Sequence, residues 1–235
     1  MISLRDFTAA RVALGRAGDS IPTQALLDFR LAHARARDTV KAPLDTVSLC
    51  SEMTARGWNV TMLRTEAKTR EEYLRRPDRG RKLDIESIQK VAEARGQCPP
   101  AVVVADGLSS VAVHRHALPV LERIVHDLEP ARIWIVQQGR VAVGDHIGEL
   151  LDAGLSVVIL GERPGLSTPD SLGVYLTWKP CLKRTDAERN CVSNIHSLGL
   201  SYDEAAHKLR FLINESRRRK LSGVELKESA GRLLG

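Results

Sequence analysis

Leu155-Ser156-Val157-Val158-Ile159-Leu160 is followed directly by Gly161-Glu162-Arg163-Pro164-Gly165-Leu166-Ser167. The first six residues form a short apolar run, which predicts a buried strand. The loop after it combines glycines and a rigid proline with one acid and one base. Ligands of open α/β sheets bind beyond the carboxyl ends of the strands. This loop is therefore either a binding loop or a solvated turn with an internal ion pair.

Two more apolar runs end in unusual loops. Residues 101–105 lead into Asp106-Gly107-Leu108-Ser109, and residues 132–136 lead into Gln137-Gln138-Gly139-Arg140. Helical patterns separate the three runs, and this alternation predicts an α/β fold with a mostly parallel sheet flanked by helices. The three loops should then meet at one edge of the sheet, as a polar rim above apolar strands.

The rest of the chain supplies one more predicted strand and several helices. Residues 172–178 are the strand, and residues 204–220 are a final helix with Ser201 as its cap. Upstream, helical patterns cover residues 21–38, 46–58 and 83–94, the last capped by Asp84. These patterns divide the chain into an N-terminal helical region, residues 1–97, and an α/β domain, residues 98–235.

Composition narrows the class of protein. The 235 residues are 43% hydrophobic and 27% charged, which suits a soluble chain with a substantial core. No apolar run approaches the roughly 20 residues that span a bilayer, and the first residues lack a signal-peptide pattern, so we expect a cytoplasmic protein without membrane contact. The four cysteines, at positions 50, 98, 181 and 191, contain no Cys-x-x-Cys pair. A zinc ribbon or thioredoxin-type site is therefore not supported.

The net charge of +6 leaves two interpretations open. Basic residues cluster at 75–82 and at 217–220, as expected either for a solvated or protein-facing surface or for a nucleic-acid-binding α/β domain. Aromatic side chains are not interleaved with these clusters, which argues against single-stranded nucleic acid. A nucleic-acid binder would lose affinity steeply as salt rises.

Catalytic candidates from the residues alone are few. Neither the Gly-x-Gly-x-x-Gly fingerprint nor a Walker A motif follows any strand. His114 and His116 are two residues apart on a predicted helix and do not share a face, so surface histidines are expected rather than a metal site. A stand-alone enzyme would have to use Asp106, at a strand end, as a base and Cys191 as a nucleophile.

An ordered set of motifs identifies a family. The set is Ala-Arg-Val-Ala-Leu-Gly-Arg-Ala-Gly (10–18), Pro-Thr-x-x-Leu-Leu-x-Phe (22–29), His-Ala-Arg-Ala-Arg-Asp (33–38), Ala-Asp-Gly-Leu-Ser (105–109), Gly-Glu-Arg-Pro-Gly-Leu (161–166), Asp-Ser-Leu-Gly-Val-Tyr (170–175) and Arg-Asn-Cys-Val-Ser-Asn-Ile-His (189–196). Together, over nearly the whole chain, these motifs resemble the small subunit of ethanolamine ammonia-lyase.

The resemblance implies a role in an adenosylcobalamin-dependent lyase. That family converts ethanolamine to acetaldehyde and ammonia by radical amino migration, with the substrate site on a large subunit. The small subunit packs a Rossmann-like α/β domain against the corrin, so the cofactor lies between the two chains. By resemblance, the cobalamin contacts of this chain are Val141, Glu162 and Cys191, and the chain carries neither catalytic residues nor a metal site of its own.

The resemblance also implies how the cofactor and the partners are arranged. None of the seven histidines has an aspartate two residues before it, which fits a base-on cobalamin rather than one held by a protein histidine. We expect the N-terminal helical region to dock on the large subunit in a higher-order hetero-oligomer, and the chain alone to show no turnover. Some members carry a longer N-terminal extension that directs the enzyme into a bacterial microcompartment. This chain starts close to the first shared motif, so targeting through it is not expected, and the large subunit is then the remaining route into a microcompartment.

Overall fold

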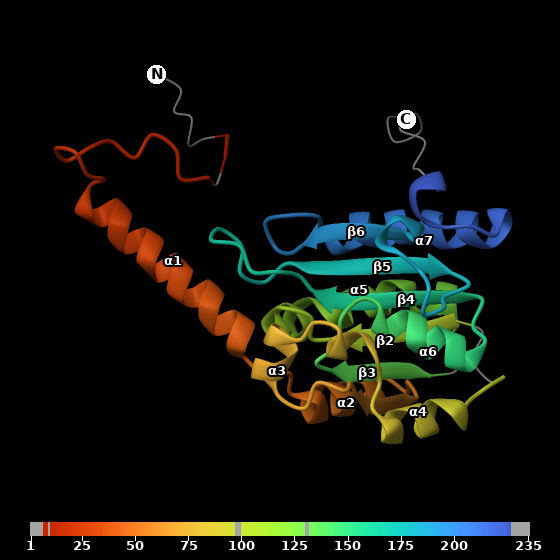
Figure 1. The fold of residues 1–235 in the computed structure, drawn as a ribbon. Coiled ribbons are helices and arrows are strands. Elements are labelled where there is room, and N and C mark those ends of the chain that lie inside the picture. The colour runs from red at the N-terminus through yellow and green to blue at the C-terminus, as the bar shows by residue number, and fades with distance from the viewer. Residues whose placement is uncertain (1–6, 9, 97–99, 130–131, 227–235) are drawn as a thin grey trace, which may run out of the picture.

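The computed structural model describes residues 7–8, 10–96, 100–129 and 132–226. The molecule is built around a single mixed sheet (Figure 1). Its six strands lie in the order β1-β3-β2-β4-β5-β6. They are β1 (Val60–Arg64), β2 (Pro100–Ala105), β3 (Ile133–Gln137), β4 (Leu155–Gly161), β5 (Leu172–Trp178) and β6 (Arg189–Ile195). Strands β1 to β4 are parallel, whereas β5 is antiparallel to both β4 and β6. The predicted α/β class with a mostly parallel sheet is confirmed.

Three helices cover one face of the sheet. They are α2 (Thr46–Ala55), α5 (Ser110–Leu128) and α7 (Tyr202–Arg219). Their apolar side chains pack on alternate strand residues such as Val102, Val104 and Ile159, because successive side chains of a strand point to opposite faces.

The other face carries α4 (Ile85–Ala92) and α6 (Val143–Leu151). The intervening strand residues, among them Val103, Trp134 and Val158, are buried under these two helices. Strands β2 and β4 are thus covered on both sides, which explains their near-continuous apolar sequences.

Local sequence signals place the helix starts. The Asp84 side chain accepts the Ser87 N–H at the start of α4, and Ser201 with Glu204 forms a capping box at the start of α7. Both predicted caps are confirmed. Short helical turns at 79–81, 186–188 and 223–225 complete the described elements.

Some elements differ from the sequence-based expectation. The N-terminal region, expected to be helical, contributes β1 to the sheet, and residues 189–195, for which no element was predicted, form β6. Both are edge strands with few buried side chains, and hence weak apolar patterns. Helix α3 (Arg70–Arg75) was not predicted, and α5 continues through Pro119 to Leu128.

Helix α1 (Thr23–Lys41) extends away from the sheet and its covering helices (Figure 1). Among its described residues only Thr39 is buried. In the part of the chain that the structure describes, no helix is long and apolar enough to cross a bilayer.

Candidate functional site

The loops after β2 and β3 are joined by the side chain of Asp106. Its carboxylate accepts the backbone N–H groups of Gln138 at 3.0 Å and Gly139 at 2.9 Å, and it pairs with Arg70 at 3.2 Å. Asp106 is only 1% exposed, and burial raises the pKa of its carboxyl group to about 6 although Arg70 opposes the shift. With these partners Asp106 organises the edge of the sheet, and the hypothesis of a free catalytic base gains no support from the geometry.

The loops after β2 and β4 approach each other through two glycines. Leu108 donates its N–H to the Gly161 carbonyl at 2.9 Å. A Cβ on Gly107 would lie 2.2 Å from the same carbonyl oxygen, and one on Gly161 would lie 2.0 Å from the Ser109 oxygen. Only glycine permits this approach. The three loops therefore converge at one edge, as the sequence predicted.

A stack of cations on Tyr73 closes the site on the α3 side. The guanidinium carbons of Arg70 and Arg140 lie 4.7 Å and 4.3 Å from the centre of the Tyr73 ring. The Tyr73 hydroxyl donates to the Gly139 carbonyl at 3.1 Å, and burial raises its pKa. Tyr73 gave no signal in the sequence because it lies in the unpredicted helix α3, and Arg140 appeared there only as the end of a loop motif.

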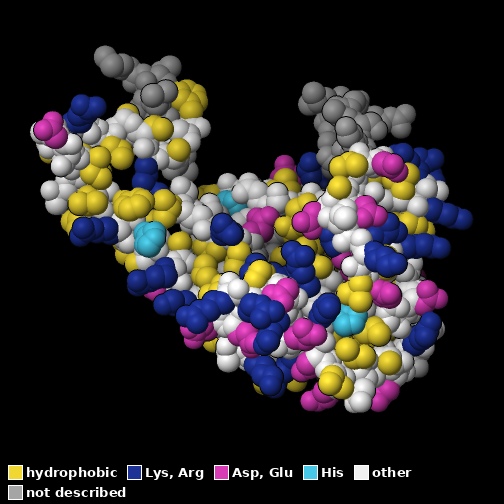
Figure 2. All heavy atoms as spheres, viewed as in Figure 1, with side chains coloured by type: hydrophobic (Ala, Val, Ile, Leu, Met, Phe, Trp, Pro, Cys, Tyr) yellow, Lys and Arg dark blue, Asp and Glu magenta, His cyan; other side chains and the backbone are white. Residues whose placement is uncertain are grey.

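These elements surround a pocket of about 760 Å³. Val141 and Glu162, two of the three residues expected to contact the cofactor, line it together with Leu108, Leu160 and Tyr175. Figure 2 shows Lys and Arg side chains gathered among hydrophobic ones on this face of the molecule, between α3 and α6. The pocket thus combines an apolar floor with a charged rim.

Glu162 connects the β4 loop to two other segments. Its carboxylate accepts a 2.5 Å hydrogen bond from the Ser171 hydroxyl and a 3.2 Å hydrogen bond from the Asn194 N–H. It is half-buried at the mouth of the pocket. One carboxylate therefore holds the start of β5 and the end of β6 at the same rim.

Cys191, the third expected contact, lies beside this pocket rather than in its wall. It stands opposite Tyr175 in the β5–β6 register, and its thiol interacts with the Tyr175 hydroxyl. The residue is exposed, yet local burial raises the pKa of the thiol to about 11, with Glu162 adding to the shift. A protonated thiol can contribute packing and weak hydrogen bonding, but it is a poor nucleophile.

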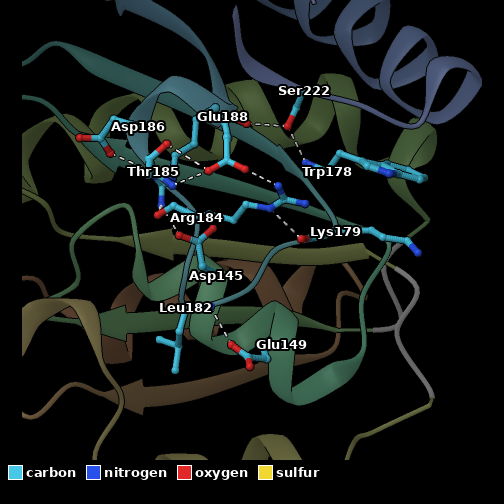
Figure 3. A network of polar contacts seen from close by, with 11 residues as sticks. Asp145, Glu149, Trp178, Lys179, Leu182, Arg184, Thr185, Asp186, Glu188 and Ser222 are labelled. Atoms are coloured by element: carbon cyan, nitrogen blue, oxygen red, sulfur yellow. Dashed lines mark hydrogen bonds and ion pairs between the residues drawn. The ribbon is translucent and has the colours of Figure 1, made fainter. Parts of the chain in front are cut away.

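The segment from Arg184 to Arg189 forms the remaining wall and is held by a polar network (Figure 3). Arg184 donates to the Lys179 carbonyl and pairs with Glu188, which caps the turn at Thr185. Arg189, 4% exposed at its side chain, pairs with the equally buried Asp145 of α6. This wall is therefore fixed to α6 and to the sheet.

The two histidines considered for a metal site have structural partners instead. His114 accepts the Asp45 N–H at 3.0 Å. His116 contacts the Tyr202 hydroxyl at 2.8 Å and Asp170 at 3.4 Å. It is 4% exposed, so the expectation of two surface histidines was wrong for His116, whose side of α5 faces α7. Among the described residues, no group of three His, Cys, Asp or Glu side chains is arranged to hold a metal.

The two basic clusters are largely engaged in local contacts. Arg75, Arg76 and Arg79 pair with acids of the same segment. On α7, Arg218 pairs with Glu215, and the neighbouring arginines donate to backbone carbonyls. The structure gives these clusters intramolecular roles.

Comparison with known proteins shows the family of this chain. The sequence model of the family described as ethanolamine ammonia-lyase light chain matches residues 1–227. The ethanolamine ammonia-lyase small subunit of Pseudomonas aeruginosa (strain LESB58) is 51% identical over 239 residues, covering 97% of this chain and 87% of that protein. The same subunit of Azotobacter vinelandii is 52% identical over 237 residues, with the same coverage. In Pseudomonas putida (strain GB-1) the identity is 50% over 238 residues, covering 97% of this chain and 88% of the relative. The chain belongs to the ethanolamine ammonia-lyase light chain family.

Proposed function

We propose that this chain is the small subunit of an adenosylcobalamin-dependent ethanolamine ammonia-lyase and holds one side of the cofactor. The observation that carries the proposal is the pocket at the carboxyl edge of the sheet. Val141 and Glu162 line it, and Cys191 adjoins it through Tyr175. Val141 and Glu162 thus share this pocket, and Cys191 reaches it only through its contact with Tyr175.

The residues present fit a corrinoid. Leu108, Val141 and Leu160 offer an apolar floor for a broad, largely apolar ring, and the Glu162 carboxylate can accept hydrogen bonds from peripheral amides. The Nε of Arg140 is buried without a hydrogen-bond partner, as expected where a ligand supplies the acceptor. Pockets of this volume enclose drug-sized ligands, and a cobalamin is larger. A second protein surface is therefore needed to cover it.

The side chains of this chain suit cofactor binding rather than substrate chemistry. When bound, adenosylcobalamin supplies the radical chemistry. This chain binds and orients it, while the substrate site belongs to the large subunit. Purified chain supplied with adenosylcobalamin and ethanolamine, without a large subunit, should therefore form no acetaldehyde. Acetaldehyde production by the chain alone would contradict this division.

The experiment that tests the cofactor role compares two carboxylate variants. Glu162→Gln keeps the size of the side chain and removes its charge, and Glu86→Gln does the same on α4, where Glu86 pairs with the exposed Lys90. In the complex with the large subunit, Glu162→Gln should weaken cobalamin binding about tenfold, since a hydrogen bond to a charged group contributes about 1.5–3 kcal/mol. Glu86→Gln should leave it unchanged. Equal affinity in Glu162→Gln and wild type would count against the proposal.

A further inference from the structure

The charge of the pocket is not balanced by its own residues. Five arginines line it: Arg81, Arg140, Arg163, Arg184 and Arg189. Arg184 pairs with Glu188, and Arg189 pairs with Asp145 and Asp186. Within the described parts of the chain, no carboxylate lies within ion-pair distance of the other three. Against these three free cations stands Glu162, so the pocket carries an excess of positive charge.

Arg140 is the most constrained of the three. Its guanidinium stacks on Tyr73, its backbone N–H donates to the Gly80 carbonyl at 2.7 Å, and its stem packs against Gly80, where a Cβ would lie 2.9 Å from Cγ. Arg81 and Arg163 are exposed. A stacked guanidinium is held in a fixed plane, which lowers the entropy lost when it binds an anion.

Two further features favour an anion beside Arg140. Its Nε is buried and has no hydrogen-bond partner. Val141 and Ala142 line the pocket immediately before α6, whose first turn has no side-chain cap. The N–H groups of Val143, Gly144 and Asp145 already donate to the carbonyls of residues 140–142. The helix therefore favours a negative ligand group here only through the partial positive charge of its amino end.

We propose that Arg140 anchors the phosphodiester that links the corrin to the nucleotide base of the bound cobalamin. This inference rests on the proposed function, because it names the part of that ligand which the positive end of the pocket holds. The phosphodiester is the anion of the nucleotide tail, whereas the amides of the corrin are neutral. Glu162 and Arg140 then bind different parts of the ligand. The carboxylate accepts hydrogen bonds from the amides, and the guanidinium donates hydrogen bonds to the phosphate.

The test uses the complex with the large subunit and three corrinoids. Cyanocobalamin carries the phosphodiester and the base, cobinamide phosphate carries a phosphate without the base, and cobinamide carries neither. Dissociation constants are measured by equilibrium dialysis for wild type, Arg140→Met and Arg140→Lys. Arg132→Met is the matched control, because Arg132 stacks on Trp134 at 5.5 Å, at the opposite end of β3.

The proposal predicts an effect that depends on the phosphate. Arg140→Met should raise the dissociation constants of cyanocobalamin and cobinamide phosphate about 10- to 100-fold. The dissociation constant of cobinamide should change by less than about twofold. Arg140→Lys should retain part of the affinity, because lysine keeps the charge and loses the planar fork. Arg132→Met should match wild type with all three ligands.

Two outcomes would overturn the inference while leaving the proposed function intact. Equal losses for all three corrinoids in Arg140→Met would make Arg140 a general support of the pocket, and no loss for any would remove it from the site. If the wild-type complex bound neither cyanocobalamin nor cobinamide, the proposed function would fail and this inference with it. A thermal melt of each variant complex separates loss of folding from loss of binding.

Discussion

The carboxylate of Asp106 accepts the backbone N–H of Gly139 at 2.9 Å and thereby joins the ends of β2 and β3. Asp106 is buried and also holds Arg70, which stacks on Tyr73. Arg140 stacks on the same ring and directly precedes Val141 in the chain. The position of the proposed cofactor contacts therefore depends on a residue that does not line the pocket.

The raised pKa of Asp106 predicts an unusual pH dependence of stability. Between its ordinary value of 3.8 and about 6, the folded protein binds a proton that the unfolded chain has lost. This group's contribution to stability therefore falls as pH rises from 4 to 6. Relative to Asp106→Asn, which cannot titrate, wild type should lose about 2 kcal/mol between pH 4 and pH 7. Urea unfolding of both proteins across this range measures the difference. A relative gain by wild type would show that Arg70 and the two N–H donors outweigh burial.

The approach of the β2 and β4 loops predicts a sharp difference between two glycines of one loop. Gly161→Ala would place Cβ 2.0 Å from the Ser109 carbonyl oxygen, so the backbone must move. Gly165→Ala meets nothing nearer than the Thr168 oxygen at 3.5 Å. We expect Gly161→Ala to destabilise the fold by about 3 kcal/mol or more and Gly165→Ala by less than about 1 kcal/mol. Thermal melts of the two variants test this, and similar midpoints would contradict the close approach.

Cys191 should react slowly despite its exposed position. A thiol pKa of about 11 leaves roughly 100-fold less thiolate at pH 8 than an ordinary cysteine has. Iodoacetamide labelling followed by mass spectrometry should show Cys191 modified far more slowly than glutathione in the same solution. Unfolding in urea should restore the ordinary rate. A rate within tenfold of glutathione in the folded chain would mean that the thiol is not buried against Tyr175.

The buried pair of Arg189 and Asp145 should contribute to the wall of the pocket. Arg189→Met leaves the Asp145 carboxylate buried without its cation, which costs about 3–5 kcal/mol in comparable pairs. The control is Arg76→Met, because Arg76 and Asp78 form an ion pair with side chains 57% and 60% exposed, and surface pairs contribute little. Only the first variant should shift the urea midpoint. A stable Arg189→Met protein would show that this wall does not need the pair.

Helix α1 offers a surface suited to a partner protein. Leu27, Phe29 and Leu31 are 53%, 39% and 51% exposed, so their replacement by serine should leave the fold intact. If this helix docks on the large subunit, the triple variant should co-purify with it poorly on a sizing column. The same three-residue change at Ile85, Leu182 and Val224, which are also exposed, should have no effect. Normal assembly of the α1 variant would contradict docking through this helix.

The strands that are covered on both faces were predictable from the sequence, and the two edge strands, β1 and β6, were not. Pro100–Ala105 and Leu155–Gly161 are buried throughout and read as continuous apolar runs. In β6 only Arg189, Val192 and Ile195 are buried, so the sequence shows neither an apolar run nor a two-residue alternation, and no strand was predicted around Cys191. The convergence of the three loops was predictable because parallel strands end at a common edge. The stack of Tyr73 on Arg140 was not, since it joins a short helix to a loop more than sixty residues away.

Hydrogen–deuterium exchange of the complex, with and without adenosylcobalamin, tests the central claim most directly. The account predicts slower exchange on cofactor binding in three segments of this chain: 139–143 at the start of α6, 161–166 after β4, and 190–194 in β6. Exchange in α7, which lies on the opposite face of the sheet, should not change. Protection confined to other segments, or no protection in this chain, would contradict the assignment of the pocket to the cofactor.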